Sequence, residues 1–327
     1  MPRGKFSVIS DRDFIHLYKK IGFREIIRQT GLSSNAIAER RRKLESKHGP
    51  INGPRGCPNG ANPHIAVSPQ RRHYDCLNGI VIIGSDAHIV PGPLTVAQRA
   101  FLKFIKELKP RVVIANGDIL DFGAISRHDP LQWEDTPPVI AELEAAQSFM
   151  QMVEDAAPSN CKLAWPAGNH DARFQARLAK VAPEYSGVRG TRLKGHFSPK
   201  WEPCYSAFIN DDTVVKHRLR GGVGALRNNV LASRKNTITG HLHAQHAWPV
   251  TAYPARRGEL PETLWGVDAG MLGEPYAEAF SYTEDNPVDW RAGFVILQFH
   301  KGRLMPPELV TVWSRHEVTC NGKIIAV

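Results

Sequence analysis

The chain has few cysteines and no long apolar run, and both absences limit the class of protein to which it can belong. Its 327 residues include only five cysteines, none of them in a C-x-x-C pair. This odd, irregularly spaced set argues against a disulfide framework and favours reduced thiols in the cytoplasm. No stretch of eighteen apolar residues occurs, and no charged-then-apolar leader opens the chain. We therefore expect neither membrane insertion nor secretion.

Acidic residues are scarce in one part of the chain. Residues 1–75 contain fifteen Lys or Arg and six Asp or Glu, a net charge of +9, whereas the remainder carries 27 basic and 26 acidic side chains. Almost all of the overall net charge of +10 therefore lies in the first quarter of the sequence. Basic charge confined to one segment predicts contact with a polyanion.

Five short strings of metal-ligating residue types follow one another along the rest of the chain. Each comes directly after a short apolar run, of the kind that forms a buried strand. Helical patterns over 95–108 and 139–153 alternate with these runs, which predicts an α/β sheet with a site beyond the carboxyl ends of its strands. The strings are Asp86-Ala87-His88, Gly117-Asp118-Ile119-Leu120-Asp121, Gly168-Asn169-His170-Asp171, a single His217, and Gly240-His241-Leu242-His243.

The side chains of these strings indicate a metal centre. Mixed carboxylate, amide and imidazole ligands suit Mn, Fe, Zn or Ni better than Ca or Mg alone. No cysteine lies near any string, so a thiolate zinc site is excluded. Two such cations side by side can activate a bridging water and stabilise the oxyanion of an in-line displacement. The strings therefore predict hydrolytic chemistry that passes through an oxyanion.

The order of the strings resembles the calcineurin-like metallophosphoesterase superfamily, whose pattern reads D-x-H, G-D-x-x-D, G-N-H-D/E, a lone H and G-H-x-H. The resemblance covers residues 79–327 and implies a four-layer α/β/β/α sandwich with two divalent metal ions, Mn first and Fe, Zn or Ni as alternatives. It implies that His170 acts as general acid or phosphate donor and that Asp121 orients its ring. One metal would be held by Asp86, His88, Asp118 and His243, and the other by Asp118, Asn169, His217 and His241.

Three further residues are candidates for contact with an anionic substrate. Arg127 and His128 lie in the long segment that follows the second string, and Arg173 comes shortly after Asp171. Long segments over a cleft commonly carry substrate contacts. An ordinary surface role is equally consistent with all three.

Residues 1–50 resemble a small all-α helix-turn-helix DNA-binding domain. Helices are expected over 13–20, 23–29 and 34–47, with a turn at 31–33. Ser34 and Asn35 would then begin the recognition helix and face base edges. The basic run that follows would contact phosphates: Arg40, Arg41, Arg42 and Lys43. The alternative is an amphipathic helix whose charges only aid solubility. Residues 51–78 are rich in Pro and Gly and are predicted to be a linker.

These features predict a dinuclear-metal phosphoesterase, most simply a phosphodiesterase or nuclease that acts on DNA through a metal-bridged hydroxide. The combination of the basic domain with the C-terminal pattern over 286–294 is similar to phosphoesterases of bacteriophages and prophages, which favours DNA as partner and places the protein in the host cytoplasm if it is phage-encoded. Two alternatives stay open. One is a phosphomonoesterase for a nucleotide, phosphoprotein or small phosphate ester, and the other is a DNA-binding protein with an idle esterase domain.

Overall fold

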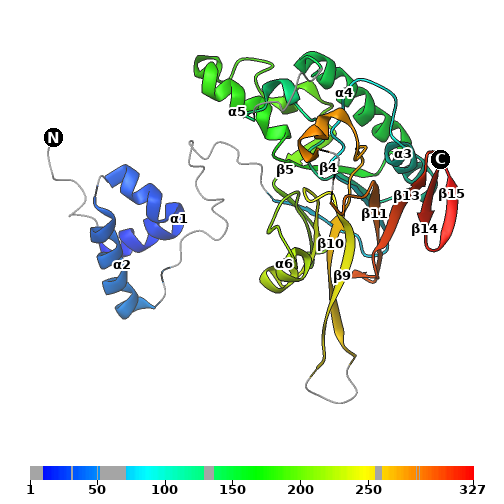
Figure 1. The fold of residues 1–327 in the computed structure, drawn as a ribbon. Helices are drawn as coiled ribbons and strands as arrows, with labels where there is room; N and C mark the ends of the chain where they lie inside the picture. The colour runs from blue at the N-terminus through cyan, green and yellow to red at the C-terminus, as the bar shows by residue number, and fades with distance from the viewer. Residues whose placement is uncertain are drawn as a thin grey trace. The chain divides into compact units, whose positions relative to one another are not determined.

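The computed structural model describes residues 10–30, 32–49, 51, 71–128, 136–254, 260–284, 286 and 288–327. The chain divides into two compact units, residues 1–68 and 69–327 (Figure 1). Most of the predicted linker lies outside the described residues, which include only residue 51 and residues 71–78 of it. Within the described residues, no helix has the length and apolarity that crossing a bilayer requires.

The second unit is a mixed α/β structure built on two sheets. The larger sheet has nine strands in the order β15-β14-β13-β11-β2-β3-β4-β5, with β12 paired to β11. Its strands are β2 (Gly79–Gly84), β3 (Val112–Ala115), β4 (Lys162–Pro166), β5 (Trp201–Cys204), β11 (Gly293–His300), β12 (Arg303–Leu304), β13 (Glu308–Ser314), β14 (Glu317–Cys320) and β15 (Lys323–Ala326). The four strands β2 to β5 run parallel to one another.

The smaller sheet has six strands in the order β1-β6-β7-β8-β10-β9. Its strands are β1 (Arg71–Tyr74), β6 (Ser206–Ile209), β7 (Thr213–Val215), β8 (Asn236–Thr239), β9 (Gln245–Ala252) and β10 (Glu262–Ala269). Here β7, β8 and β10 are parallel neighbours. The apolar runs before the five strings therefore form β2, β3, β4, β7 and β8, which confirms the predicted strands and divides them between two sheets.

One strand corrects the predicted linker. Residues Arg71–Tyr74, inside the segment 51–78, pair in parallel with Ser206–Ile209 as β1. The four residues are Arg, Arg, His and Tyr, so no apolar run predicts a strand at this position. An edge strand needs neighbours on one side only, and its polar side chains can stay in water.

Two apolar cores lie on opposite faces of the larger sheet. Side chains alternate between the faces of a strand, so Ile82 packs in one core while Val81 and Ile83 pack in the other. The first core includes residues of α3 (Val96–Leu108) and α4 (Val139–Ala156), and the second includes residues of the smaller sheet. The outer contacts of the smaller sheet include α6 (Ala225–Ser233), which packs on β8, β9 and β10.

Among the described residues of this unit, the remaining helical elements are α5 and four 3-10 helices. Their bounds are α5 (Asp171–Val181), η1 (Gly123–Ile125), η2 (Pro183–Tyr185), η3 (Leu193–His196) and η4 (Glu278–Thr283). The predicted helices over 95–108 and 139–153 are confirmed as α3 and α4. Thr95 and Gln98 form a reciprocal capping box at the start of α3, which satisfies two backbone donors that the helix leaves without partners.

The described part of the first unit contains two helices, α1 (Asp11–Thr30) and α2 (Ser34–His48). The helices predicted over 13–20 and 23–29 are a single helix, which corrects the expected three-helix arrangement. The helix continues through Gly22, because one glycine costs a helix only about 1 kcal/mol relative to alanine. The helices pack through a small core of Phe14, Tyr18, Ile26, Ile37, Leu44 and Ile51.

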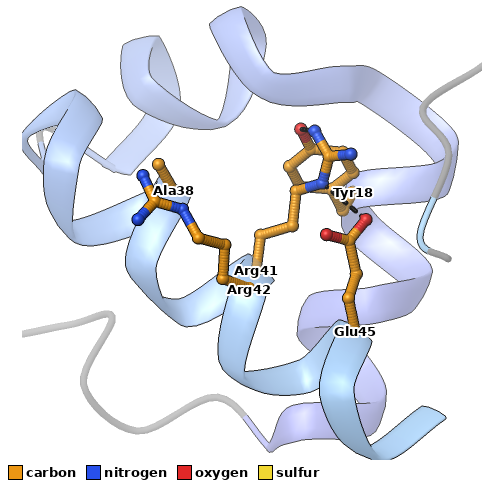
Figure 2. A pocket seen from close by; sticks show the side chains of 5 residues that line it. All are labelled: Tyr18, Ala38, Arg41, Arg42 and Glu45. Carbon is orange, nitrogen blue, oxygen red and sulfur yellow. Dashed lines mark hydrogen bonds and ion pairs between the residues drawn. The ribbon is translucent and has the colours of Figure 1, made fainter. Parts of the chain in front are cut away.

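Two of the four predicted phosphate contacts are engaged inside this unit. Arg40 pairs with Asp11 at 3.1 Å and lies 4.7 Å over the ring of Phe14. Arg41 donates to Glu45 at 2.8 Å and to the Tyr18 hydroxyl at 3.0 Å (Figure 2). These contacts connect α2 to α1, a role that charge patterning alone did not indicate.

The other basic side chains of the run face solvent. Arg42 and Lys43 are exposed. Figure 2 shows Arg42 extending away from the Tyr18 side, towards Ala38, along a hollow of about 440 Å³ lined by Tyr18, Ala38, Arg41, Arg42 and Glu45. The side chains of Ser34 and Asn35 lie outside the described residues. Ser33 accepts a hydrogen bond from the Ala36 N–H and so caps α2.

Candidate metal centre

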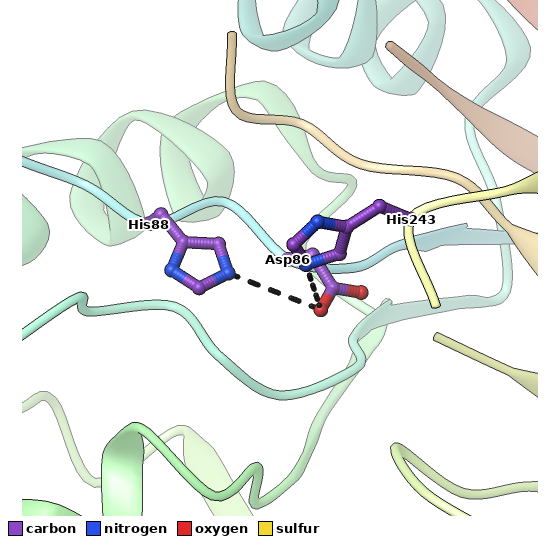
Figure 3. Close-up of side chains that lie close together, drawn as sticks. All are labelled: Asp86, His88 and His243. Atoms are coloured by element: carbon purple, nitrogen blue, oxygen red, sulfur yellow. Dashed lines mark ion pairs between the residues drawn. The ribbon is translucent and has the colours of Figure 1, made fainter. Parts of the chain in front are cut away.

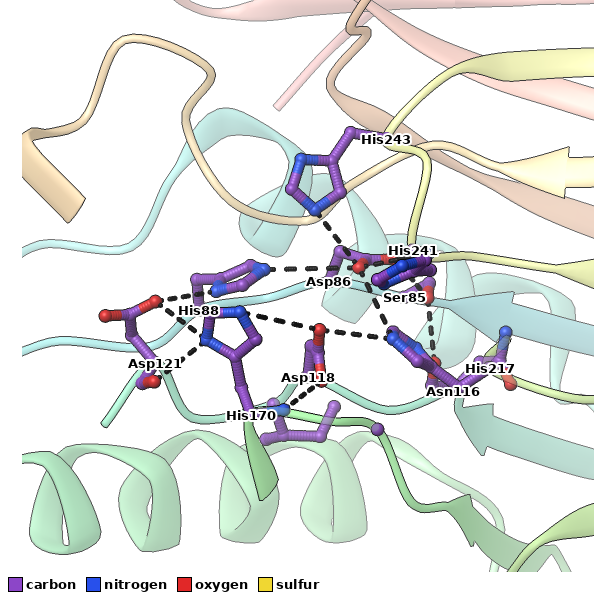
Figure 4. Close-up of polar contacts among 12 residues, drawn as sticks. Ser85, Asp86, His88, Asn116, Asp118, Asp121, His170, His217, His241 and His243 are labelled. Atoms are coloured by element: carbon purple, nitrogen blue, oxygen red, sulfur yellow. Dashed lines mark hydrogen bonds and ion pairs between the residues drawn. The ribbon is translucent and has the colours of Figure 1, made fainter. Parts of the chain in front are cut away.

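The ends of five strands bring the predicted site residues together. From the larger sheet, Asp86 and His88 follow β2, Asp118 follows β3, and Asn169 and His170 follow β4. From the smaller sheet, His217 follows β7, and His241 and His243 follow β8. Figure 4 shows the side chains that it labels converging from both sheets on one largely buried cluster: Asp86, His88, Asp118, His170, His217, His241 and His243.

Five residues of this cluster have strained backbones. Asp86, His88, Asp118, His241 and His243 all have positive φ, between 42° and 71°. This left-handed conformation costs a non-glycine residue on the order of 1 kcal/mol or more, and it persists only where the surroundings enforce it. Such residues gather at functional sites. The surrounding structure therefore holds these five residues in an unfavourable backbone conformation, and this conformation directs their side chains into the cluster.

The glycines in the strings are required by close approach of the loops. A Cβ on Gly168 would overlap Oδ1 of Asp118, and a Cβ on Gly240 would overlap Oγ of Ser85 and Oδ2 of Asp86. A Cβ on Gly117 would lie 2.6 Å from the ring of His217. Any side chain at these positions would push the strand ends apart. Each glycine therefore allows residues from two different strings to approach each other closely.

A first group of potential ligands comprises Asp86, His88 and His243. Their ligand atoms all lie within 4.8 Å of one another. Oδ1 of Asp86 is 3.2 Å from Nε2 of His243 and 4.0 Å from Nε2 of His88. Figure 3 shows both rings directed at this oxygen. All three residues are buried, so bulk water does not surround the group.

A second group comprises Asp118, His217 and His241, again with ligand atoms within 4.8 Å. Nε2 of His217 is 3.1 Å from Oδ2 of Asp118 and 4.0 Å from Oδ1 of Asp86. The two groups are therefore adjacent. Asn169 belongs to the neighbouring β4 loop, and its Oδ1 is buried without a hydrogen-bond partner.

The buried atoms without partners indicate that the cluster fits divalent cations. Nε2 of His88, Nε2 of His217 and Oδ1 of Asn169 have no hydrogen-bond partner. A buried polar atom without a partner costs about 1–3 kcal/mol, and a cation would satisfy several at once. Nδ1 of His88 lies 2.9 Å from Oδ1 of Asp121, and Nδ1 of His217 lies 2.7 Å from the Asn116 carbonyl oxygen. These bonds hold each ring with Nε2 towards the cluster, as in metal-ligating histidines.

Asp121 lies between two imidazoles. Its Oδ1 is 2.9 Å from Nδ1 of His88 and 3.1 Å from Nδ1 of His170. Burial raises the pKa of Asp121, but the hydrogen bonds from His170 and His88 outweigh burial and hold that pKa well below its ordinary range. The side chain is therefore a carboxylate that accepts from both rings. Asp121, His88 and His170 form a third close group. The Nδ1 atoms of both histidines are already hydrogen-bonded to the Asp121 carboxylate.

Arg173 is brought to this group, whereas the other predicted substrate contacts are not. Arg173 donates to the Asp121 carbonyl oxygen at 2.9 Å, and its other Nη lies 3.1 Å from Nε2 of His170. Arg127 and His128 are exposed, and their side chains contact each other at 3.5 Å. None of the contacts described for that pair reaches the cluster.

Asp171 supports the cluster in a way that the ligand pattern did not reveal. It is the first residue of α5 and is buried. Its carboxylate accepts hydrogen bonds from the backbone N–H groups of Asp118, Ile119 and Gly168 and from Nε1 of Trp165. The only signal in the sequence was its place at the end of the third string. Asp171 thus connects the loops after β3 and β4.

Comparison with known proteins adds little to this geometry. No protein family matches the chain, and no curated protein matches it. Among solved structures, the chain is similar to the crystal structure of wild-type Vps29 complexed with Zn²⁺ from Entamoeba histolytica. The two share 11% sequence identity, the match covers 76% of this chain and 98% of that chain, and the TM-score is 0.35. A similarity this distant supports no statement about activity.

Proposed function

We propose that residues 69–327 form a phosphoesterase that depends on two divalent metal ions. The observation that carries this proposal is the pair of adjacent Asp-His-His groups with buried nitrogen and oxygen atoms that lack partners. Asp86, His88 and His243 would hold one ion, and Asn169, His217 and His241 the other, with Asp118 between them. The two sheets packed between helices support the four-layer arrangement expected from the resemblance.

The donor set favours Mn, with Fe, Zn or Ni as alternatives, because imidazole and carboxylate ligands are mixed. When bound, such ions would polarise a phosphoryl oxygen and lower the pKa of a bound water molecule. Coordination at the buried nitrogens would also satisfy atoms that otherwise have no partner. The ions would thus stabilise the site that they serve.

His170 is placed to assist departure of the leaving group. Its Nδ1 is held by the side chain and carbonyl oxygen of Asp121, and its Nε2 lies 4.0 Å from Oδ2 of Asp118. In this structure Nε2 accepts from Arg173, which can only donate, so Nε2 would carry a proton to an oxygen that leaves phosphorus once Arg173 has turned to a phosphate oxygen. Arg173 brings a fixed positive charge within 3.1 Å of the same nitrogen, where it can contact a phosphate oxygen.

The substrate that we propose is a phosphodiester of DNA, in the cytoplasm. The net charge of +9 in residues 1–75 supports a polyanionic partner, and the exposed Arg42 and Lys43 are the phosphate contacts that we propose in that segment. Such contacts act without base specificity and weaken as salt rises. They would raise the local concentration of DNA without taking part in hydrolysis.

The chemistry is tested on Mn-loaded protein with an aryl phosphate diester and an aryl phosphate monoester. Asp118→Asn should lower turnover at least about a hundredfold, since a neutral amide replaces the central carboxylate. Asp211→Asn is a matched control because Asp211 has a similar φ of 59° but is exposed. Retention of most activity in Asp118→Asn would remove the assigned role. Faster hydrolysis of the monoester would favour the phosphomonoesterase, and a protein that retains no metal would favour an idle domain.

The DNA assignment is tested in the full chain with Arg42→Ala combined with Lys43→Ala. Turnover on DNA should fall several-fold at low salt and the difference should shrink at high salt, while turnover on the small diester stays constant. Lys106→Ala with Lys323→Ala is the control, because it removes the same charge from exposed positions of the second unit. An equal loss on both substrates would exclude a DNA-specific role for the first unit.

A further inference from the structure

Three aromatic side chains form a packed series beside the metal centre. Phe280 lies edge-on to His88, with ring centroids 4.8 Å apart, and 5.5 Å from the ring of His243. The ring of Trp290 lies 4.2 Å from that of His243 and 5.1 Å from that of Phe280. Tyr282 then contacts Phe280 and Trp290 at 6.3 and 6.2 Å. The series therefore begins at two proposed metal ligands.

Exposure rises steadily along this series. Phe280 is 2% exposed, Trp290 is half-buried, and Tyr282 is 56% exposed. Contacts with the two inner rings fix the position of Tyr282, so its planar surface is presented to solvent with little freedom left to lose on binding. Aromatic rings of this kind give large contact areas at low conformational cost.

Charges of the same cluster influence the pKa of the Tyr282 hydroxyl. Burial of the hydroxyl, together with the negative charges of Asp121 and Asp86, raises the pKa of Tyr282 to about 12, and Arg173 opposes this shift. The phenol therefore stays neutral at physiological pH.

We propose that Tyr282, supported by Phe280 and Trp290, stacks on the nucleobase attached to the phosphate at the metal centre. This inference rests on the proposed phosphoesterase function and specifies its substrate as a nucleotide unit. A small alkyl phosphate or a phosphoserine side chain offers no planar ring that could stack on Tyr282, whereas a nucleotide does. Stacking of a base on an aromatic side chain is worth about 1–3 kcal/mol and tolerates any base, which suits an enzyme that acts along a DNA strand.

The experiment compares two ligands of the Mn-loaded full chain by isothermal titration calorimetry: thymidine 5′-monophosphate and inorganic phosphate. Tyr282→Leu should weaken thymidine monophosphate binding about 5- to 150-fold, which corresponds to a loss of about 1–3 kcal/mol. Its affinity for inorganic phosphate should be unchanged. Tyr282→Phe keeps the ring and should retain the affinity of the original protein for both ligands. Trp248→Leu is the control, since Trp248 is 54% exposed on β9.

The outcomes separate this inference from the esterase proposal. Unchanged thymidine monophosphate binding in Tyr282→Leu, an equal loss for both ligands, or no nucleotide binding by the original protein would each overturn the stacking role. If the protein binds the nucleotide through Tyr282 but hydrolyses no phosphate ester, the stacking surface stands and the esterase proposal fails. If hydrolysis proceeds and Tyr282→Leu affects neither ligand, the reverse holds.

Discussion

Replacing Asp171 by Asn tests whether a buried carboxylate outside the ligand set holds the metal centre together. Oδ2 of Asp171 accepts from the backbone of Asp118 at 3.0 Å, from that of Gly168 at 2.9 Å and from Nε1 of Trp165 at 3.0 Å. Oδ1 accepts from the backbone of Ile119 at 3.0 Å and from that of Leu120 at 3.4 Å. An Asn side chain has one acceptor oxygen in place of two. In its best orientation it keeps the three bonds at Oδ2 and turns its NH₂ towards the Ile119 N–H.

The cost follows because the NH₂ of the Asn then faces the N–H groups of Ile119 and Leu120, which lose their acceptor. A buried donor without a partner costs about 1–3 kcal/mol. Burial and the charge of Asp118 raise the pKa of Asp171, so loss of its charge relieves part of that cost. We therefore expect a net loss of about 2–3 kcal/mol. For a unit of this size, about 2–4 °C in Tm corresponds to each kcal/mol, which gives a decrease of about 4–12 °C.

The assay is thermal unfolding of the full chain followed by metal analysis after loading with Mn. Asp155→Asn is the control, because Asp155 is an exposed carboxylate on α4 that accepts from Gln151. If Asp171 acted only as a negative charge at the start of α5, the loss would be about 0.3–1 kcal/mol. A decrease in Tm no larger than that of the control, with metal content unchanged, would refute the proposed support of the loops after β3 and β4.

Two other changes have expected outcomes. Gly240→Ala should lower the retained Mn sharply, because its Cβ would overlap Ser85 and Asp86, whereas Gly195→Ala meets no atom within 4 Å and should retain the metal; equal metal content in both variants would count against the close approach. Glu142→Gln should raise Tm more at pH 8 than at pH 5, because burial raises the pKa of Glu142 from 4.5 to about 7. Its ionisation therefore costs the folded state up to about 3 kcal/mol as pH rises through this window, and an equal shift at both pH values would contradict that cost.

The strands and helices that flank the site were predictable because their signals are local. The apolar runs before Asp86 and Asp118 became β2 and β3, and the Thr95–Gln98 capping box begins α3 as expected. The predicted break near Gly22 was wrong, since packing of Phe14 and Ile26 with α2 holds α1 together through the glycine. The role of Arg41 was also hidden, because its partner Tyr18 lies on another helix.

The sequence alone determined which residue types could bind metal, that each follows a strand, and where the excess positive charge lies. Only the tertiary structure decided that the strands divide between two sheets and that Asp171 joins two loops. It also decided that an aromatic series begins at His243 and ends at Tyr282. The physical reason is the range of the interactions. Apolar periodicity and capping act between residues a few positions apart, whereas strand pairing and most side-chain contacts across the site join residues from about thirty to more than a hundred and fifty positions apart, whose proximity no local pattern records.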